Sequence, residues 1–347
     1  MAYCYDNLKL DKGMYREAGR SFSQVLERED PSERYKGTSL EGLDAFQRQL
    51  KRFNIKVKGE ASDPVEVFFQ TSDAAVLFPE YIARTVRQGI EEGDILPSIT
   101  AAVTRIDGLD YRSITSEAGG EDKKLKPVNE GAAIPSVEEG AEIPATTIKV
   151  QANLVKLKKR GRMLVASYEA IRFQKLDLFS VTLRQIGAHI ARTHLEDAVD
   201  VLIKGDGNTN PAAVTAIETG KTLDYGALVD FWAKFDPYTM NTLLVSGDVM
   251  LKLLKLPEFQ NPLTGLNFQG TGKLTTPLGA NLLRTSVLAE KTAIGLDRRF
   301  ALEMVRSGDV MVEYDKLIDR QLERAAITTI SGFAKVFTKA SQVLKTT

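Results

Sequence analysis

The sequence is poor in the residues that most often carry redox chemistry and metal binding. Its 347 residues include one cysteine, Cys4, and two histidines, His189 and His194. A single cysteine excludes a disulfide within the chain and is typical of a protein kept in a reducing compartment. The two histidines do not share one face of a helix, and no third histidine joins them. We therefore expect no metal site and no Cys–His nucleophile.

The chain also lacks an excess of charge and a long apolar run. Lys+Arg and Asp+Glu each number 46, so the formal net charge is zero. A protein that grips nucleic acid usually has a basic excess, so we expect only weak, non-specific contact with it. No apolar run approaches the ~20 residues that span a membrane. The first residues lack the basic start and apolar core of a signal peptide. These absences predict a soluble protein made in the cytoplasm.

One segment resembles a phosphate-binding loop but fails where the chemistry is strict. It is Gln269-Gly-Thr-Gly-Lys-Leu-Thr. Such a loop needs a glycine five residues before the Gly-Lys pair and a Ser or Thr after the lysine. Those positions hold Asn267 and Leu274. Nucleotide binding is therefore not expected.

A second segment has the spacing of the first ligands of a calcium loop. Asp206, Asn208 and Asn210 stand at alternate positions, but Pro211 replaces the glycine that makes the sharp turn. Ile217 stands where a bidentate glutamate is needed. We interpret these residues as a polar turn after a helix. No Gly-x-Ser-x-Gly elbow and no spaced carboxylate pair points to catalysis, so we expect no enzyme activity and no cofactor.

The N-terminal residues give weak signals. Residues 1–36 are mixed and charged, and they predict an extended arm or a partly ordered leader. Thr38 and Glu41 have the spacing of a capping box, and an apolar stripe follows them, which predicts a helix over 38–53. Whether that stripe packs on its own chain or on a neighbour stays open.

Two further helices have clearer limits. Pro79 marks the expected first turn of one helix, and Gly93 its end. The strongest helical pattern in the chain is an apolar face over residues 178–203. Asp177 is its expected N-cap and Gly205 its end.

Between these helices lies a long polar excursion. A strand is expected through 109–116, and apolar residues roughly alternate with polar ones again over 148–157. The residues between, 117–147, are dense in Gly, Glu and Pro. The pattern predicts an extended hairpin with too little apolar content to fold alone. A neighbouring copy of the chain is the economical surface for it.

The last third of the chain predicts a compact mixed region and then strands. Residues 223–235 and 249–256 have helical patterns, and 242–245, 281–287 and 293–296 have strand patterns. The C-terminal stretch predicts long strands broken at Gly332, with a helix across Leu317–Ala326 as the competing interpretation.

The order of these parts, with several short motifs, resembles the Hong Kong 97 fold of tailed-phage capsid proteins. The resemblance covers about residues 65–340. The motifs are Leu77-Phe-Pro-Glu-Tyr-Ile, Val128-Asn-Glu-Gly-Ala-Ala-Ile-Pro, Leu164-Val-Ala-Ser-Tyr-Glu-Ala, Leu176-Asp-Leu, His194-Leu-Glu-Asp-Ala, Lys204-Gly-Asp-Gly and Leu296-Asp-Arg-Arg-Phe-Ala-Leu.

The resemblance implies an α+β fold with an N-terminal arm, an extended E-loop hairpin, a peripheral domain with a long spine helix, and an axial α/β domain. The expected boundaries are 1–66 for the arm and its helix, 67–104, 161–215 and 298–347 for the peripheral domain, 105–160 for the E-loop and 216–297 for the axial domain.

The implied function is that of a major capsid protein. It would assemble with itself into hexamers and pentamers of an icosahedral virion shell around double-stranded DNA. A portal protein is an implied partner, as are scaffold and decoration proteins where they exist. The E-loop residues expected to contact a neighbour are Lys123, Lys124, Lys126, Glu130, Glu138, Glu139 and Glu142. An encapsulin-like nanocompartment is the alternative, and a soluble enzyme a remote one.

Two properties found in some family members bear on this chain. Some lock the shell by an isopeptide bond between an E-loop lysine and an asparagine in the C-terminal part of the peripheral domain of another subunit. The last asparagine here is Asn281, so we expect a shell held by non-covalent contacts. Some lose an N-terminal segment to a protease. We expect residues 1–60 to stay in the particle.

Overall fold

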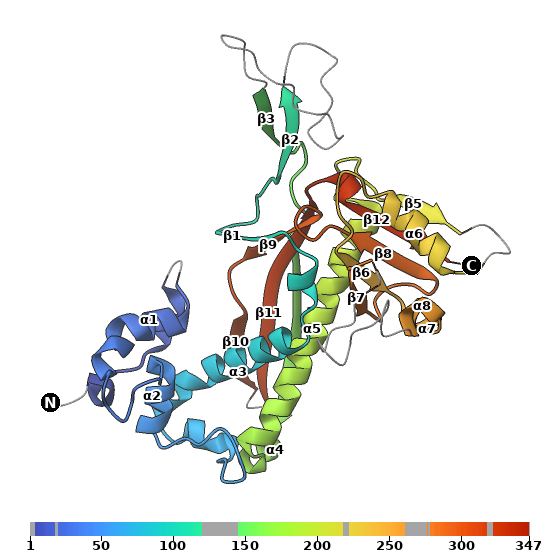
Figure 1. Ribbon diagram of the computed structural model, residues 1–347. Coiled ribbons are helices and arrows are strands. Elements are labelled where there is room, and N and C mark those ends of the chain that lie inside the picture. Colours follow the sequence, from blue (N-terminus) through green and yellow to red (C-terminus); the bar gives the residue numbers. More distant parts are fainter. Residues whose placement is uncertain are drawn as a thin grey trace. The chain divides into compact units, whose positions relative to one another are not determined.

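The chain folds into two compact units, each built from separate segments. The computed structural model describes residues 4–17, 20–119, 145–217, 222–260, 276, 278–317 and 322–346 (Figure 1). The first unit takes residues 1–94, 159–192 and 307–330, and the second takes 95–158, 193–306 and 331–347. The division falls inside helix α5 and strand β11, so each unit contains a part of both elements.

The first unit combines helices with a small part of a β-sheet. In it, β11 pairs with β4 and also antiparallel with β10, from Met311 opposite Thr328 to Leu317 opposite Leu322. Its elements are α1 (Phe22–Glu29), α2 (Ala45–Arg52), α3 (Ser72–Glu92), β4 (Lys158–Ser167), α4 (Tyr168–Phe173), β10 (Met311–Leu317), and parts of α5 (Leu176–Lys204) and β11 (Leu322–Lys335).

The N-terminal residues do not form the extended arm that the sequence predicts. Their described part makes short helical pieces instead: 3-10 turns at Cys4–Asn7, Lys12–Arg16 and Ser32–Tyr35, together with α1. Large side chains in and between these pieces are buried, among them Phe22 of α1 and Leu10 between the first two turns. The arm prediction was wrong because short pieces that change direction leave no single hydrophobic period to detect.

The helix expected over 38–53 exists, but it begins later. Its capping box is formed by Asp44 and Gln47, not by Thr38 and Glu41. Phe46 and Leu50 belong to the buried core of the first unit. The stripe left open by the sequence therefore packs on its own chain.

Helix α3 begins seven residues before the proline expected to start it. Thr71 caps it, and Pro79 lies inside it. At this point the Tyr15 hydroxyl donates to the Val76 carbonyl at 2.8 Å and accepts from the Glu80 N–H at 3.1 Å. The hydroxyl thus joins the two backbone groups that an uninterrupted helix would pair directly. A side chain distant in sequence makes the internal proline tolerable, which local sequence cannot reveal.

Two glycines bring the backbones of α3 and α5 into contact within the first unit. A Cβ added at Gly187 would lie 2.2 Å from the Val86 carbonyl oxygen, and one added at Gly89 would lie 2.2 Å from the Arg184 carbonyl oxygen. Real Cβ atoms essentially never come within 3.0 Å of another heavy atom. The close crossing therefore requires glycine at both positions.

The second unit contains a five-stranded sheet in the order β5-β12-β8-β6-β7. The pairs β12–β5 and β6–β7 are parallel, and β8 is antiparallel to both of its neighbours. Its elements are β1 (Ala102–Ile106), β2 (Ile114–Gly119), β3 (Ala145–Val150), β5 (Ala213–Ala216), α6 (Tyr225–Ala233), β6 (Thr242–Val245), α7 (Gly247–Leu254), α8 (Pro257–Gln260), β7 (Asn281–Arg284), β8 (Thr292–Leu296), β9 (Leu302–Ser307) and β12 (Ser341–Lys345).

Side chains alternate between the two faces of this sheet. Leu243 of β6 packs in a cluster with Phe231 of α6, whereas Leu244 packs in another with Val199 of the second unit's part of α5. Gly295 of β8 admits no side chain, because a Cβ there would lie 2.8 Å from the Phe231 ring. The sheet is therefore covered on both faces, which explains the wholly buried β6.

Several sequence predictions are confirmed. The long helix is α5, and Gly205 follows it with a positive φ of 85°. Asp177 was expected as its N-cap but lies in the first turn, where its carboxylate accepts from the Gly59 N–H. The C-terminal stretch forms strand β11, so the competing helix across Leu317–Ala326 was wrong for its described residues. The expected break at Gly332 was also wrong, because β11 continues through Gly332, which pairs with Val305 of β9. No helix in the described part of the chain is long and apolar enough to cross a membrane.

Candidate subunit-contact surfaces

The predicted hairpin is present as a two-stranded ribbon. Strands β2 and β3 pair antiparallel, from Ile114 opposite Val150 to Gly119 opposite Ala145 (Figure 1). Among the described residues no third strand joins them. Ile114 and Val150 are 50% and 61% exposed. A two-stranded ribbon is marginally stable alone, so this pair is suited to gain stability from a partner surface.

The outgoing stem of the hairpin, residues 107–113 between β1 and β2, is held by one carboxylate. Glu303 of β9 accepts hydrogen bonds from the hydroxyls of Thr104, Tyr111 and Ser113, and the Tyr111 bond measures 2.7 Å. Glu303 is 6% exposed and Ser113 is fully buried. Burial, and then the hydrogen bond to Glu303, raise the pKa of Tyr111 above its ordinary value. Tyr111 therefore stays a neutral hydrogen-bond donor.

The returning stem, residues 151–157 between β3 and β4, is held by amide side chains. Gln151 donates to the Lys335 carbonyl at 3.1 Å, and Asn208 donates to the Gln151 side-chain oxygen at 3.1 Å. The Asn153 N–H donates to Asn208 at 3.0 Å. Asn208 lies in the turn that ends α5, where its own N–H donates to the Asp206 carboxylate. These contacts confirm the prediction of a polar turn at this place.

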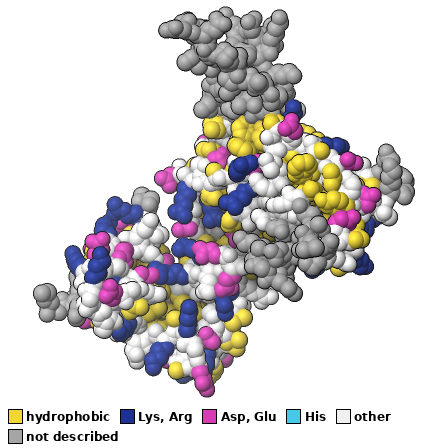
Figure 2. All heavy atoms as spheres, viewed as in Figure 1, with side chains coloured by type: hydrophobic (Ala, Val, Ile, Leu, Met, Phe, Trp, Pro, Cys, Tyr) yellow, Lys and Arg dark blue, Asp and Glu magenta, His cyan; other side chains and the backbone are white. Residues whose placement is uncertain are grey.

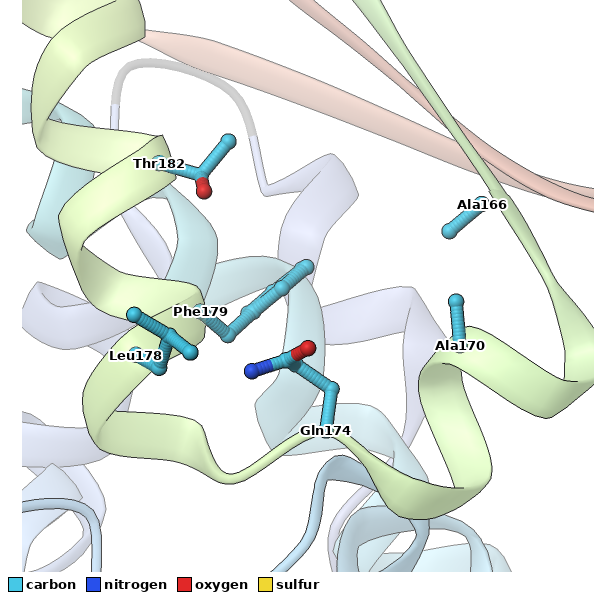
Figure 3. Close-up of a pocket in the computed structure, with 6 residues that line it drawn as sticks. All are labelled: Ala166, Ala170, Gln174, Leu178, Phe179 and Thr182. Atoms are coloured by element: carbon cyan, nitrogen blue, oxygen red, sulfur yellow. The ribbon is translucent and has the colours of Figure 1, made fainter.

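A second exposed surface lies in the first unit, around α4 and the start of α5. Figure 3 shows a groove there, with Phe179 and Leu178 on α5 and Ala170 on α4. Its volume is about 360 Å³. The residues that line it are Ala166, Ala170, Gln174, Leu178, Phe179 and Thr182. Phe173 and Leu178 are 75% and 61% exposed, which is characteristic of surfaces that bind another protein.

Exposed apolar side chains also occur over the second unit. Figure 2 shows hydrophobic side chains gathered on the face in view of that unit. Trp232 of α6 and Leu251 of α7 are 41% and 62% exposed. Scattered exposed apolar residues are ordinary, but aromatic ones are enriched where proteins meet.

The charged residues predicted to contact a neighbour all lie outside the described residues. They are Lys123, Lys124, Lys126, Glu130, Glu138, Glu139 and Glu142. The loop with the Gly-Lys pair at 269–275 also lies outside them. Within the described part, no group of three His, Cys, Asp or Glu side chains is placed to hold a metal ion. His189 and His194 both lie on α5.

The comparison with protein families shows which kind of protein carries these surfaces. A family model described as phage capsid protein matches residues 151–338, which is more than half of the chain. The chain belongs to the phage capsid protein family. Its role is that of a capsid protein, a structural component of the virion. Among curated proteins, none matches the sequence.

Similar solved structures identify the fold of this capsid protein. The capsid of a native GTA particle matches with a TM-score of 0.51 and 14% identity, over 76% of this chain and 90% of that one. A virus-like particle from Pyrococcus furiosus matches with a TM-score of 0.50 and 14% identity, over 77% and 99%. Gordonia phage Cozz matches with a TM-score of 0.50 and 13% identity, over 73% and 86%. The fold is the Hong Kong 97-like α+β fold.

Sequence reasoning missed the residues that hold the hairpin stems. Glu303 stands in an ordinary strand pattern, and its hydroxyl partners are 190 to 199 residues away in the chain. Asn208 was noticed only as part of a failed calcium loop. One signal was available: a lone glutamate within the otherwise apolar run Ala301 to Val305 indicates a buried polar contact.

Proposed function

We propose that this capsid protein is the major subunit of an icosahedral shell, in which it forms hexamers and pentamers around double-stranded DNA. The observation that carries the proposal is the β2–β3 ribbon. It exposes apolar residues at its base and has no covering strand among the described residues. A neighbouring copy that covers it would supply the burial that the ribbon lacks.

The proposed division of labour follows the family resemblance. Residues 216–297 form the axial domain around the capsomer axis, and the hairpin within 105–160 reaches over a neighbour. Residues 67–104, 161–215 and 298–347 form the peripheral domain, and 1–66 add the N-terminal part. The groove beside α4 supports a peripheral contact surface, because Leu178 in its lining and Phe173 at the end of α4 are both exposed.

The lysines and glutamates of the hairpin are proposed to form salt bridges with neighbouring subunits. Each exposed pair is worth roughly 0–1 kcal/mol and weakens with salt. The shell therefore depends on the sum of many modest contacts. The subunit is proposed to have no enzyme activity, because the family is structural. The further partners proposed are a portal protein, scaffold and decoration proteins where they exist, and DNA held weakly. Synthesis is proposed to occur in the cytoplasm of a host bacterium.

Deletion of residues 119–142 tests the role of the hairpin. The shortened subunit should fold, with a nearly unchanged circular dichroism spectrum because β3 and all of β2 except Gly119 remain, but it should not assemble. A full-length control, in which Lys123, Lys124 and Lys126 are alanine, separates the loss of charge from the loss of the loop. Particles of normal size from the deletion variant would refute the role given to this loop.

The nature of the cargo separates this proposal from the encapsulin-like alternative. Particles made during infection should protect double-stranded DNA from nuclease. Particles that enclose a protein and no DNA would favour the alternative.

A further inference from the structure

We propose that Glu303 and Asn208 are positioning residues that fix the direction in which the hairpin leaves the subunit, so that assembly requires them although neither needs to touch a neighbour. We call their contacts the hairpin clasp: Glu303 with Thr104, Tyr111 and Ser113, and Asn208 with Gln151 and Asn153. The inference rests on the proposed function, because it assumes that the hairpin contacts another subunit.

The hydrogen bonds of Glu303 fix the orientation of the outgoing stem. Glu303 lies opposite Ala334 in the β9–β11 pair, so its backbone is fixed by the sheet. A carboxylate offers about four acceptor positions. Two hydroxyls from the stem, those of Tyr111 and Ser113, approach it together with the Thr104 hydroxyl of β1. Burying a carboxylate is costly, and charge-assisted hydrogen bonds offset that cost only when the geometry is kept. The stem is therefore held in one orientation, which an apolar contact would not impose.

The Asn208 half holds the other stem to a second rigid element. Asn208 is fixed at the end of α5 by the Asp206 carboxylate, which its N–H and its side-chain amide both reach, at 3.1 and 3.0 Å. From there it bonds to both Gln151 and Asn153. The Asn153 side chain adds a bond of 2.7 Å to the Gly207 carbonyl.

The two stems are also joined to each other, so the two halves act on one body. The Gln151 N–H donates to the Ser113 carbonyl and the Val155 N–H to the Tyr111 carbonyl, both at 2.8 Å. Ser113 and Tyr111 are held by Glu303 through their side chains, and Gln151 by Asn208. Both halves therefore hold the base of the same ribbon, and loosening either half weakens its anchoring.

A small tilt at the base of the ribbon causes a larger displacement at its far end. Strand β2 has six residues, which span about 20 Å at ~3.3 Å per residue. A tilt of about 10° at the base would then move the far end of β2 by roughly 3.5 Å over that ~20 Å length. Such a displacement exceeds the tolerance of hydrogen bonds and side-chain packing. The displaced ribbon would then no longer fit its contact surface on a neighbouring subunit.

The test uses full-length variants, and those at Glu303, Thr104 and Ser113 nearly preserve side-chain size. Glu303→Gln keeps the volume but turns one acceptor into a donor, and Thr104→Val with Ser113→Ala removes two donors from the other side. Asn208→Ala removes the side-chain hydrogen bonds to Gln151 and Asn153 in the second half of the clasp. Glu313→Gln, on the exposed part of β10, is the matched control. Each variant is examined by thermal unfolding, by amide hydrogen exchange and by its assembled fraction at the wild-type half-assembly concentration.

We expect the clasp variants to fold, with an unfolding temperature below that of the wild type, because the Glu303, Thr104 and Ser113 changes leave buried polar groups with fewer hydrogen bonds. Amide exchange over 111–116 and 149–155 should become about tenfold faster or more, with β6 and β8 unchanged. The assembled fraction should fall at least threefold, and the control should match the wild type. Loss of assembly without faster exchange at the stems would overturn the inference, as would faster exchange with normal assembly.

If Glu303→Gln does not fold, the Thr104/Ser113 double variant and Asn208→Ala carry the test, and normal behaviour of both refutes the clasp. If the wild type forms no particles, the proposed function fails. The exchange comparison then still decides whether these residues hold the stems, and unchanged exchange overturns the clasp.

Discussion

The glycine contact between α3 and α5 allows a sharp prediction about stability. In Gly187→Ala the new methyl group would lie 2.2 Å from the Val86 carbonyl oxygen and 2.8 Å from the Ile90 nitrogen. Both obstacles are backbone atoms, which no change of rotamer can move. The helices must therefore separate by about 0.8 Å, the difference between 2.2 Å and the 3.0 Å limit.

The magnitude follows from two opposing effects. Forcing an extra methyl group into a close-packed contact costs typically 1–3 kcal/mol. Replacing glycine by alanine inside a helix stabilises the helix by up to about 1 kcal/mol. Because the obstruction is rigid, we expect the cost at the upper end, so the free energy of unfolding should fall by about 2 kcal/mol.

Urea unfolding followed by circular dichroism measures this change. Gly226→Ala on α6 is the matched control, because a Cβ there would meet only the Asp224 carboxylate at 3.6 Å. The control should be neutral or more stable, by up to about 1 kcal/mol. An unchanged or raised unfolding midpoint for Gly187→Ala would refute the account of the helix crossing.

Three further predictions follow from other contacts. Tyr15→Phe leaves the Glu80 N–H and the Val76 carbonyl buried without their hydroxyl partner, so urea unfolding should show a loss of about 2–3 kcal/mol, and no loss would contradict this. Burial lowers the pKa of Lys335 from 10.5 to about 8, so the folded state disfavours its charged form. The unfolded state binds more protons between those values, and stability should therefore rise with pH across them. The rise should be about 3 kcal/mol greater than in Lys335→Met, and equal pH profiles would contradict it. Mature particles boiled in reducing detergent should run as one band near 38.3 kDa, whereas a ladder would reveal covalent cross-links.

The elements that the sequence predicted best are those with one continuous apolar pattern. The strand expected at 242–245 is β6, and the helix expected over 178–203 is α5 with a few added residues. Strand β6 is buried on both faces and reads as a continuous apolar run, whereas α5 shows an apolar stripe with the helical period, and both patterns are visible in the sequence.

The elements that it missed depend on contacts distant in the chain. The start of α3 was placed at Pro79, because no local signal shows that Tyr15 completes the helix there. The N-terminal pieces around Leu10 and Phe22 are too short for a period to appear. Their burial is decided by the α2–α3 region on which they pack.

The hairpin was predicted from its composition, but its anchoring was not. A polar stretch between two strands is a property of the sequence alone. The convergence of Thr104, Tyr111 and Ser113 on Glu303 requires the fold to bring β9 beside the stem. The contact residues predicted on the loop, such as Lys123 and Glu138, stay predictions.

Electron microscopy of the purified full-length protein tests the central claim most directly. We predict closed particles of uniform size whose reconstruction shows hexamers and pentamers, with the β2–β3 ribbon of each subunit lying on a neighbouring copy. A homogeneous 38.3 kDa species that forms no particles at any concentration or salt tested would contradict the account.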